Sequence, residues 1–310
     1  MRVPDRIEAD AVRDPALGKL VVVGVGLIGG SFALALKHAR AVETVVGVGR
    51  DVANLDTARR LGIVDRAWTQ EQRWTDELAD ADLVLLATPV GQLAALFAAI
   101  APALGPATLV TDAGSTKQDV IAAARAHLGV ALPRFVPGHP IAGTEHSGAA
   151  AASESLFQGR SVILTPLSET TLDARQRVEQ AWTACGGVVR ALDAARHDEI
   201  FAAVSHLPHA LAFALVAQLA DRADAADYFR YAASGFRDFT RLASSDPEMW
   251  RDVCLANAAA LRSELSAFRG ELDHLDALLA SADGAGLAAL FERARAARNA
   301  WLARDHDDCG

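Results

Sequence analysis

The feature that most constrains the fold is a glycine pattern near the start of the chain. The apolar run LVVVGV (20–25) contains Gly24. It is followed by Gly26 and Gly29, and an apolar helical pattern comes after them. A buried strand that turns through GxGxxG into a helix presents backbone N–H groups to a pyrophosphate. The pattern predicts a dinucleotide-binding unit, with a purely structural glycine turn as the alternative. The residues expected to bind the cofactor here are Gly24, Gly26, Leu27, Ile28 and Gly29.

Strand-like and helix-like segments alternate through the first half of the chain. Further β-branched runs lie at 44–49, 82–89, 107–114, 134–140 and 160–166, and helical patterns lie at 53–61, 91–100 and 117–128. This alternation predicts right-handed βαβ crossovers, and therefore an α/β fold with a Rossmann-type, doubly wound, mostly parallel sheet.

The pattern of the sequence changes at about Asp193, where strand-like runs stop and Ala/Leu-rich helical patterns begin. Ser245 and Glu248 form a capping-box pattern, which predicts a helix from Ser245 to about Phe268. The helical half carries more apolar positions than a small bundle can bury, so we expect a homodimer. The expected domains are an N-terminal arm (1–17), a dinucleotide-binding domain (18–192) and an all-helical substrate and dimerisation domain (193–310).

Composition excludes several classes of function. The net charge of −9 provides no basic surface for nucleic acid. Three scattered cysteines without CxxC spacing, and a charged N-terminus without an apolar leader, favour a cytoplasmic protein. The apolar stretches 20–36 and 83–111 are interrupted by Gly or Pro, so we expect no membrane span.

The residues after the second predicted strand bear on cofactor preference. NAD sites place an acid at this point, but the expected position is Gly49, followed by Arg50 and Asp51. A guanidinium suits a 2′-phosphate, so Arg50 favours NADP, whereas Asp51 would bind the ribose of NAD if the turn were tighter. Thr88 and Pro89, at the end of the third predicted strand, are also expected to bind the cofactor.

Four further segments carry a family resemblance: GSTK (114–117), GHPIAGTEHSG (138–148), VSHLPHALAFAL (204–215) and GFRDFTRLASSDPEMWRD (235–252). Together with the glycine pattern, they resemble the prephenate/arogenate (cyclohexadienyl) dehydrogenase family over residues 20–260. The resemblance implies an oxidoreductase of tyrosine biosynthesis that transfers hydride to NAD or NADP. It would convert prephenate to 4-hydroxyphenylpyruvate and CO2, arogenate to tyrosine and CO2, or both.

The resemblance also implies roles for individual residues. His139 is the expected catalytic acid/base, although a loop histidine taken alone is more often a structural hydrogen bonder. Ser115 is expected to hydrogen-bond towards His139 and the nicotinamide; the alternative is an ordinary helix N-cap. The expected substrate-binding residues are His206, His209, Glu145, Asp238, Trp250 and Arg241, the last as a carboxylate clamp.

Other interpretations remain for these motifs. His206 and His209 lack a third ligand at a recognisable spacing, so we expect no metal. Asp238 and Glu145 would be surface acids, and Trp250 a core residue. A β-hydroxyacid dehydrogenase is one alternative, but it usually relies on a lysine near the second domain, and the last lysine here is Lys117. A non-catalytic dinucleotide-sensing module is the other, and it would not need His139, Ser115 and Arg241.

Overall fold

The computed structural model of the chain describes residues 17–144 and 146–307. Glu145 and most of the predicted N-terminal arm lie outside these residues, whereas Leu17, assigned to the arm, begins the first strand. The described chain forms two compact units, and the second includes the short segments 89–91 and 115–122 together with everything from Leu192 onwards.

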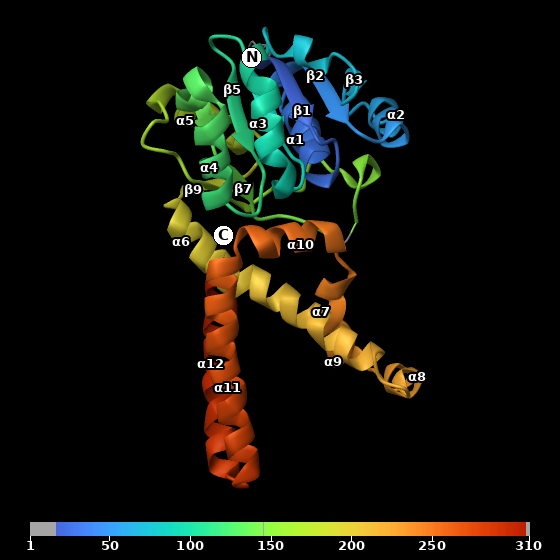
Figure 1. Cartoon of the computed structure of the whole chain (residues 1–310), viewed down its shortest axis with the longest axis vertical. Coiled ribbons are helices and arrows are strands. Elements are labelled where there is room, and N and C mark those ends of the chain that lie inside the picture. Colours follow the sequence, from blue (N-terminus) through green and yellow to red (C-terminus); the bar gives the residue numbers. More distant parts are fainter. Residues whose placement is uncertain (1–16, 145, 308–310) are drawn as a thin grey trace, which may run out of the picture. The chain divides into compact units, whose positions relative to one another are not determined.

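A parallel sheet of six strands forms the centre of the first unit, as the alternation of segments predicts (Figure 1). The strand order is β3-β2-β1-β4-β5-β6, and every pair is parallel. The central strands are mostly apolar because helices cover both faces of the sheet. The strands are β1 (Leu17–Val23), β2 (Val42–Gly49), β3 (Arg66–Thr69), β4 (Leu83–Leu86), β5 (Leu109–Asp112) and β6 (Phe135–Val136).

The helices that pack on this sheet are held by aromatic contacts on one face. Phe32 and Phe157 contact Trp182, with ring centroids 4.5 Å and 5.3 Å away, and this contact joins α1 to α5. The helices of this part of the chain are α1 (Leu27–His38), α2 (Val52–Arg60), α3 (Leu93–Ile100), α4 (Gln118–His127) and α5 (Leu172–Ala184).

The segment 134–140 departs from the single strand that its pattern predicts. Pro137 has no N–H for a ladder and separates β6 from β7 (Gly138–Pro140). Strand β7 belongs to a second sheet with β8 (Ser161–Leu164) and β9 (Val188–Ala191), and it pairs with β8 in antiparallel fashion. Strands β3 and β9 have four residues each, and none of these is buried, so the sequence pattern predicts neither strand.

The second unit is helical within its described residues, as expected. Its first long helix runs without a break from α6 (Ala194–Phe201) through a π-helical segment (Ala202–His206) to α7 (Leu207–Ala220). The others are α8 (Ala225–Arg230), α9 (Ser234–Thr240), α10 (Pro247–Ala256), α11 (Ala258–Ala280) and α12 (Gly284–Asp307), with a short 3-10 turn at Arg241–Ser244.

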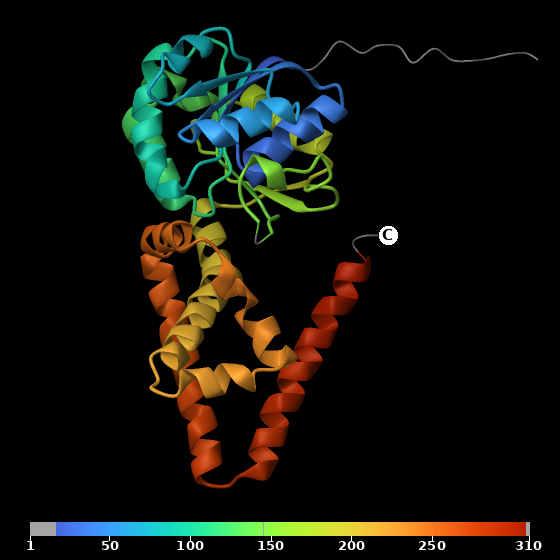
Figure 2. The same ribbon diagram turned by 90° about the vertical axis from the view of Figure 1, so that its right-hand side faces the viewer.

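Two expectations for this half are wrong in detail. The cap of α10 is Asp246, whose side chain accepts the N–H of Met249, and not Ser245, because Pro247 is the first helical residue. The helix expected to reach Phe268 ends at Ala256, and Asn257 joins it to α11. Figure 2 shows α11 and α12 leaving their connecting turn as the two arms of a V.

The described residues include one helical segment, Ala194–Ala220, that is long and apolar enough to cross a membrane. Its most apolar 18-residue window has a mean hydropathy of 1.8, and 28% of that window is buried. Length and composition alone are weak evidence, because core helices pass the same test. The segment also carries the charged residues Arg196, Asp198 and Glu199, which a bilayer interior disfavours.

Candidate active site

The glycine turn has the geometry that a bound pyrophosphate needs. Gly24 has φ +98°, and a Cβ there would lie 2.4 Å from the carbonyl oxygen of Ala87; a Cβ at Gly29 would lie 2.2 Å from the carbonyl oxygen of Gly24. At Gly26, by contrast, a Cβ would meet no atom within 4 Å. Gly26 is the N-cap of α1, and neither a capping side chain nor a first-turn acid competes for its N–H groups. The open, electropositive helix end therefore fits a phosphate group.

Asn54, which the sequence pattern does not single out, fixes this turn. Its Nδ2 donates to the carbonyl oxygen of Val25 at 2.7 Å, and its Oδ1 accepts the N–H of Ala149 at 2.7 Å. The glycine turn is thereby joined to the loop that follows β7. No short motif marks such a residue, because its two partners are 29 and 95 residues away in sequence.

Arg50 and Asp51 follow β2 with different surroundings. Arg50 is exposed. Asp51 is the N-cap of α2, and its Oδ1 accepts the N–H groups of Ala53 (2.8 Å) and Asn54 (3.3 Å). One carboxylate oxygen of Asp51 is therefore committed to the helix, while the Arg50 side chain is at the surface.

Thr88 comes after β4, beside the glycine turn. A Cβ at Gly24 would lie 3.1 Å from its Cγ2, and the buried Thr88 Oγ1 has no hydrogen-bond partner among the described residues. Pro89, the next residue, is half-buried. An unpaired buried hydroxyl at this point is consistent with a polar ligand at the turn.

The carboxylate of Asp112 ties together the loops that carry Ser115 and His139. Asp112 ends β5, is fully buried, and accepts the N–H of Gly114 at 2.8 Å and the N–H of Gly138 at 3.1 Å. These glycines directly precede the two predicted catalytic residues. His139 itself is half-buried in β7, opposite Ile163 of β8. Asp112 is not part of a local motif with either glycine loop, so the sequence pattern does not single it out.

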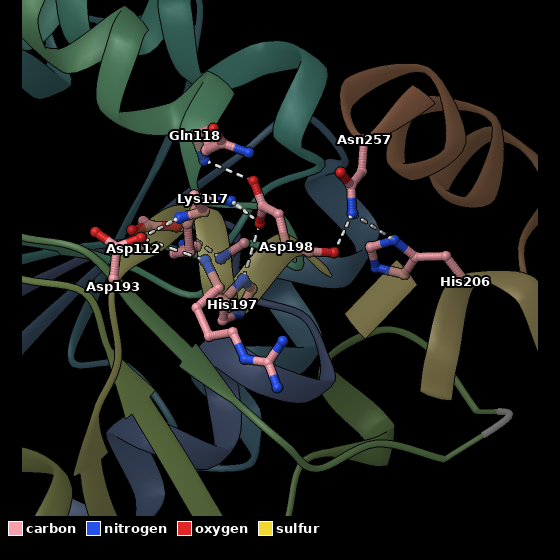
Figure 3. Close-up of polar contacts among 11 residues, drawn as sticks. Asp112, Lys117, Gln118, Asp193, His197, Asp198, His206 and Asn257 are labelled. Atoms are coloured by element: carbon pink, nitrogen blue, oxygen red, sulfur yellow. Dashed lines mark hydrogen bonds and ion pairs between the residues drawn. The ribbon is translucent and has the colours of Figure 1, made fainter. Parts of the chain in front are cut away.

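Ser115 does not serve as the cap of α4. The N–H groups of Lys117 and Gln118 are accepted by Asp198 of α6, at 2.8 Å and 2.9 Å (Figure 3). Ser115 is half-buried, and its hydroxyl has no hydrogen-bond partner among residues 17–144 and 146–307. The capping alternative for this residue is therefore wrong.

His206 and His209 lie on successive turns at the end of the π-helical segment, next to Trp250 of α10. Burial lowers the pKa of His206 to about 4, although the Asp198 carboxylate opposes this shift. The Trp250 Nε1 is buried without a hydrogen-bond partner among the described residues. Beside Trp250, a pocket of about 210 Å³ is lined by Ala210, Phe213, Pro247, Arg251 and Cys254.

Arg241 and Asp238 are both exposed, and no ion pair joins them in the described part of the chain. Burial lowers the pKa of the His209 imidazole, its hydrogen bond to the Ser205 backbone opposes this, and Arg241 is close enough to lower the pKa further. The guanidinium thus belongs to the same region as the two histidines. Glu145, the remaining predicted substrate residue, lies outside the described residues.

Other parts of the described chain offer less for a reaction. No group of three or more His, Cys, Asp or Glu residues within them is placed to hold a metal ion. A larger depression of about 760 Å³ in the first unit contains none of the predicted site residues. Its charges already pair with one another, as in Lys19 with Glu77 and Asp80.

Comparisons with known proteins agree with this arrangement. Residues 32–191 match the family model of the prephenate dehydrogenase nucleotide-binding domain, and residues 193–293 match that of the prephenate dehydrogenase dimerization domain. The chain is 37% identical to the cyclohexadienyl dehydrogenase of Zymomonas mobilis, covering 93% of this chain and 97% of that protein.

Solved structures give the same result. One is prephenate dehydrogenase of Aquifex aeolicus in complex with hydroxyphenyl propionate and NAD+, with a TM-score of 0.85, 36% identity, and coverage of 91% of this chain and 97% of that one. Another is Synechocystis arogenate dehydrogenase, with a TM-score of 0.75, 29% identity, and coverage of 91% and 99%. With both of its domains matched in order, the chain belongs to the prephenate dehydrogenase family.

Proposed function

We propose that this protein oxidises and decarboxylates prephenate, arogenate or both, with transfer of hydride to NAD(P). The observation that carries the proposal is that the Asp112 carboxylate accepts the N–H groups of both Gly114 and Gly138. These contacts anchor the backbone directly before Ser115 and directly before His139 to the same side chain. The family match favours this activity over a β-hydroxyacid dehydrogenase or a non-catalytic sensor.

In this reaction the substrate loses a hydride from C4 and a proton from the C4 hydroxyl. The C1–carboxylate bond then breaks, CO2 leaves, and the bonding electron pair makes the ring aromatic as the C4 oxygen regains a proton. The bound nicotinamide supplies the hydride acceptor. The protein must hold C4 in position, take up the hydroxyl proton and bind two anionic groups.

His139 accepts the hydroxyl proton, because an imidazole can gain and lose a proton near neutral pH. Ser115 orients the hydroxyl group, and its own hydroxyl is available because Asp198 caps α4. Both assignments follow the family resemblance, and the Asp112 contacts support them.

The helical unit provides the substrate contacts. Arg241 binds a carboxylate with its planar guanidinium, and His206 and His209 donate to and accept from substrate oxygens. Trp250 forms an apolar wall, while Asp238 and Glu145 are assigned as acidic substrate-binding groups from the family resemblance. The buried Nε1 of Trp250, which has no hydrogen-bond partner among the described residues, supports a polar ligand here.

The cofactor preference that we infer is NADP. Arg50 is exposed beside the expected adenosine ribose position, whereas one oxygen of Asp51 caps α2. A 2′-phosphate would therefore meet the Arg50 guanidinium, while one carboxylate oxygen of Asp51 is already hydrogen-bonded to the start of α2.

The protein is also proposed to be a homodimer through its helical unit. Large apolar side chains of that unit are exposed in the single chain, including Leu279 (59%), Phe291 (59%) and Trp301 (58%). Together with the dimerization-domain match, this surface supports burial against a second copy.

Steady-state rates with prephenate and arogenate, each measured with NAD and with NADP, test the function. We expect turnover of at least one substrate, release of CO2 and faster turnover with NADP. A 3-hydroxyacid such as 3-hydroxybutyrate serves as the control substrate. Turnover of that control alone, or of no substrate, would contradict the proposed function.

A further inference from the structure

Asp198 has a set of contacts that the proposed reaction does not require. Its side chain is 3% exposed, and its carboxylate accepts hydrogen bonds from His197 Nδ1 (2.8 Å) and from the N–H groups of Lys117 (2.8 Å) and Gln118 (2.9 Å) (Figure 3). Lys117 directly precedes α4 and Gln118 is its first residue, and they precede Asp198 in the sequence by 81 and 80 residues. A distant, buried carboxylate thus caps this helix.

A local cap would be the simpler solution. Ser115 and Thr116 precede α4, and hydroxyl residues at this position usually cap a helix without burying a charge. Burial by itself would raise the pKa of Asp198, but the hydrogen bonds from His197, Gln118 and Lys117 bring that pKa below its usual value. The carboxylate therefore stays ionised, and the Ser115 hydroxyl is left for another partner.

The main chain of Asp198 makes a second connection. Its carbonyl oxygen accepts from Asn257 Nδ2 at 2.7 Å, and the same Nδ2 lies 3.2 Å from His206 Nδ1. Because a carbonyl oxygen only accepts, the Asn257 atom that faces it must be the NH2 group, whose second hydrogen points to His206. The Nδ1 of His206 is then an acceptor, and its Nε2 carries the proton.

The π-helical segment makes this contact possible. The N–H of Leu207 bonds to the carbonyl oxygen of Ala202, five residues earlier, so the helix contains one residue more than a regular turn. Since each α-helical residue turns the chain by about 100°, a regular helix would aim His206 away from Asn257. Such segments are common at functional sites.

The groups that act on the charge of His206 come from three directions. Asp198 and His197 lie on α6, His209 lies one turn further along on α7, and the Ser115 backbone precedes α4. Asp198 and a hydrogen bond with the Ser115 backbone favour the protonated ring, and the two histidines disfavour it, but burial is the largest effect. His206 is therefore neutral at pH 7, as its hydrogen bond from Asn257 requires.

We propose that Asp198 is a positioning residue that holds the Ser115 turn with its carboxylate and, through Asn257, fixes the ring and tautomer of His206 with its carbonyl oxygen. This inference rests on the proposed function for its kinetic consequence but not for its structural one. One residue would then align both Ser115 and His206, whose imidazole also forms a hydrogen bond with the Ser115 backbone.

The kinetic test uses Asp198→Asn, with Asp193→Asn as the matched control. Asp193 caps α6 through Ala195 and Arg196 and is exposed, so its variant loses a capping charge on the same helix without touching Ser115 or His206. We expect Asp198→Asn to lower kcat by about 10²-fold, the cost of misplacing reacting groups, with little change in KM for the cofactor. The control should retain the wild-type kcat. Equal kcat values in the two folded variants would overturn the proposal.

A double-mutant cycle separates positioning from general stability. If Asp198 acts through Ser115, the effect of Asp198→Asn on kcat should shrink by about tenfold or more in a Ser115→Ala background. An equal loss in both backgrounds would mean that Asp198 stabilises the fold only, and the positioning role would be rejected.

The tautomer of His206 gives a readout that needs no substrate. In ¹⁵N-labelled protein at pH 7, with the signal assigned by its loss in His206→Gln, Nε2 should be protonated and Nδ1 unprotonated; Asn257→Leu should give a mixture. A protonated Nδ1 in the wild type would overturn the proposal. This measurement decides the matter if Asp198→Asn does not fold. The measurement also separates this inference from the proposed function. A wild-type protein that has the expected His206 tautomer but turns over neither prephenate nor arogenate would refute the proposed function alone.

Discussion

The imidazole of His209 lies flat against the indole of Trp250, with ring centroids 3.5 Å apart and planes inclined by 18°. Its Nδ1 is 2.9 Å from the carbonyl oxygen of Ser205, which can only accept, so Nδ1 carries the proton and Nε2 has the free lone pair. Burial keeps the pKa of His209 below its usual value; the hydrogen bond to Ser205 opposes this shift, and the nearby Arg241 adds to it. His206 has the opposite tautomer, so the two rings offer one donor and one acceptor.

The buried neutral His206 should make stability depend on pH. Its pKa is 6.5 in a free side chain and about 4 in the fold, so between these values the unfolded chain binds more protons. The free energy of unfolding should therefore fall as pH drops from 6.5 to 4, with up to about 3 kcal/mol from this group. Urea unfolding at several pH values measures it, and His206→Gln should flatten the curve. Parallel curves for the two proteins would contradict the assignment.

Replacement of His139 tests the catalytic base. His139→Asn should lower kcat by about 10²–10⁴-fold, the usual contribution of a positioned acid/base, with little change in substrate KM. Steady-state kinetics at saturating cofactor measure this effect. His127→Asn, at the exposed end of α4, is the control and should behave as the wild type. If His139→Asn kept more than about half of the wild-type kcat, His139 would have no place in the mechanism.

Arg50 should determine the affinity for NADP. Arg50→Ala should weaken NADP binding by about 1–3 kcal/mol, because a charge-assisted hydrogen bond to the 2′-phosphate is lost, and leave NAD nearly unchanged. Calorimetry with both cofactors measures this difference, with Arg59→Ala on α2 as the control. An equal loss for both cofactors, or a wild-type preference for NAD, would show that Asp51 rather than Arg50 sets the specificity.

Arg241 should act mainly on substrate binding. Arg241→Ala should raise substrate KM by a factor that corresponds to a few kcal/mol, because the carboxylate is present in both the ground and the transition state. Arg241→Lys should recover part of the loss, since an ammonium group lacks the planar pair of donors. Arg262→Ala, exposed on α11, serves as the control. A KM within about twofold of the wild type for both substrates would remove the clamp assignment.

The exposed apolar residues of α12 should be part of the dimer contact. Combined replacement of Phe291 and Trp301 by Asp should dissociate the dimer, because each would place a charge in an apolar interface. Light scattering after size exclusion measures the mass. Val130→Asp, at a position 90% exposed in the first unit, is the control. A double variant that stays dimeric would move the interface away from α12.

Local pattern was sufficient for much of the fold. The glycine turn, the alternation of strands and helices and the change of pattern at Asp193 are all written in adjacent residues, because buried strands and helix starts have local chemical requirements. The elements that the pattern misses have weak local signals. β3 and β9 have four residues each, none of them buried, and the end of α10 at Asn257 depends on hydrogen bonds to Asp198 and His206.

The residues of the candidate site also form two groups: those that local motifs identify and those that only the tertiary structure identifies. The motifs in the sequence by themselves identified His139, Ser115, His206, His209 and Arg241 as candidates, because these residues lie in family segments. Asn54, Asp112 and Asp198 emerged only from the tertiary structure. Each is an ordinary acid or amide in the sequence, and each joins backbone groups that are distant along the chain. A hydrogen bond across 80 residues leaves no periodic trace, so only the folded chain decides which carboxylate caps α4 and which histidine nitrogen carries the proton.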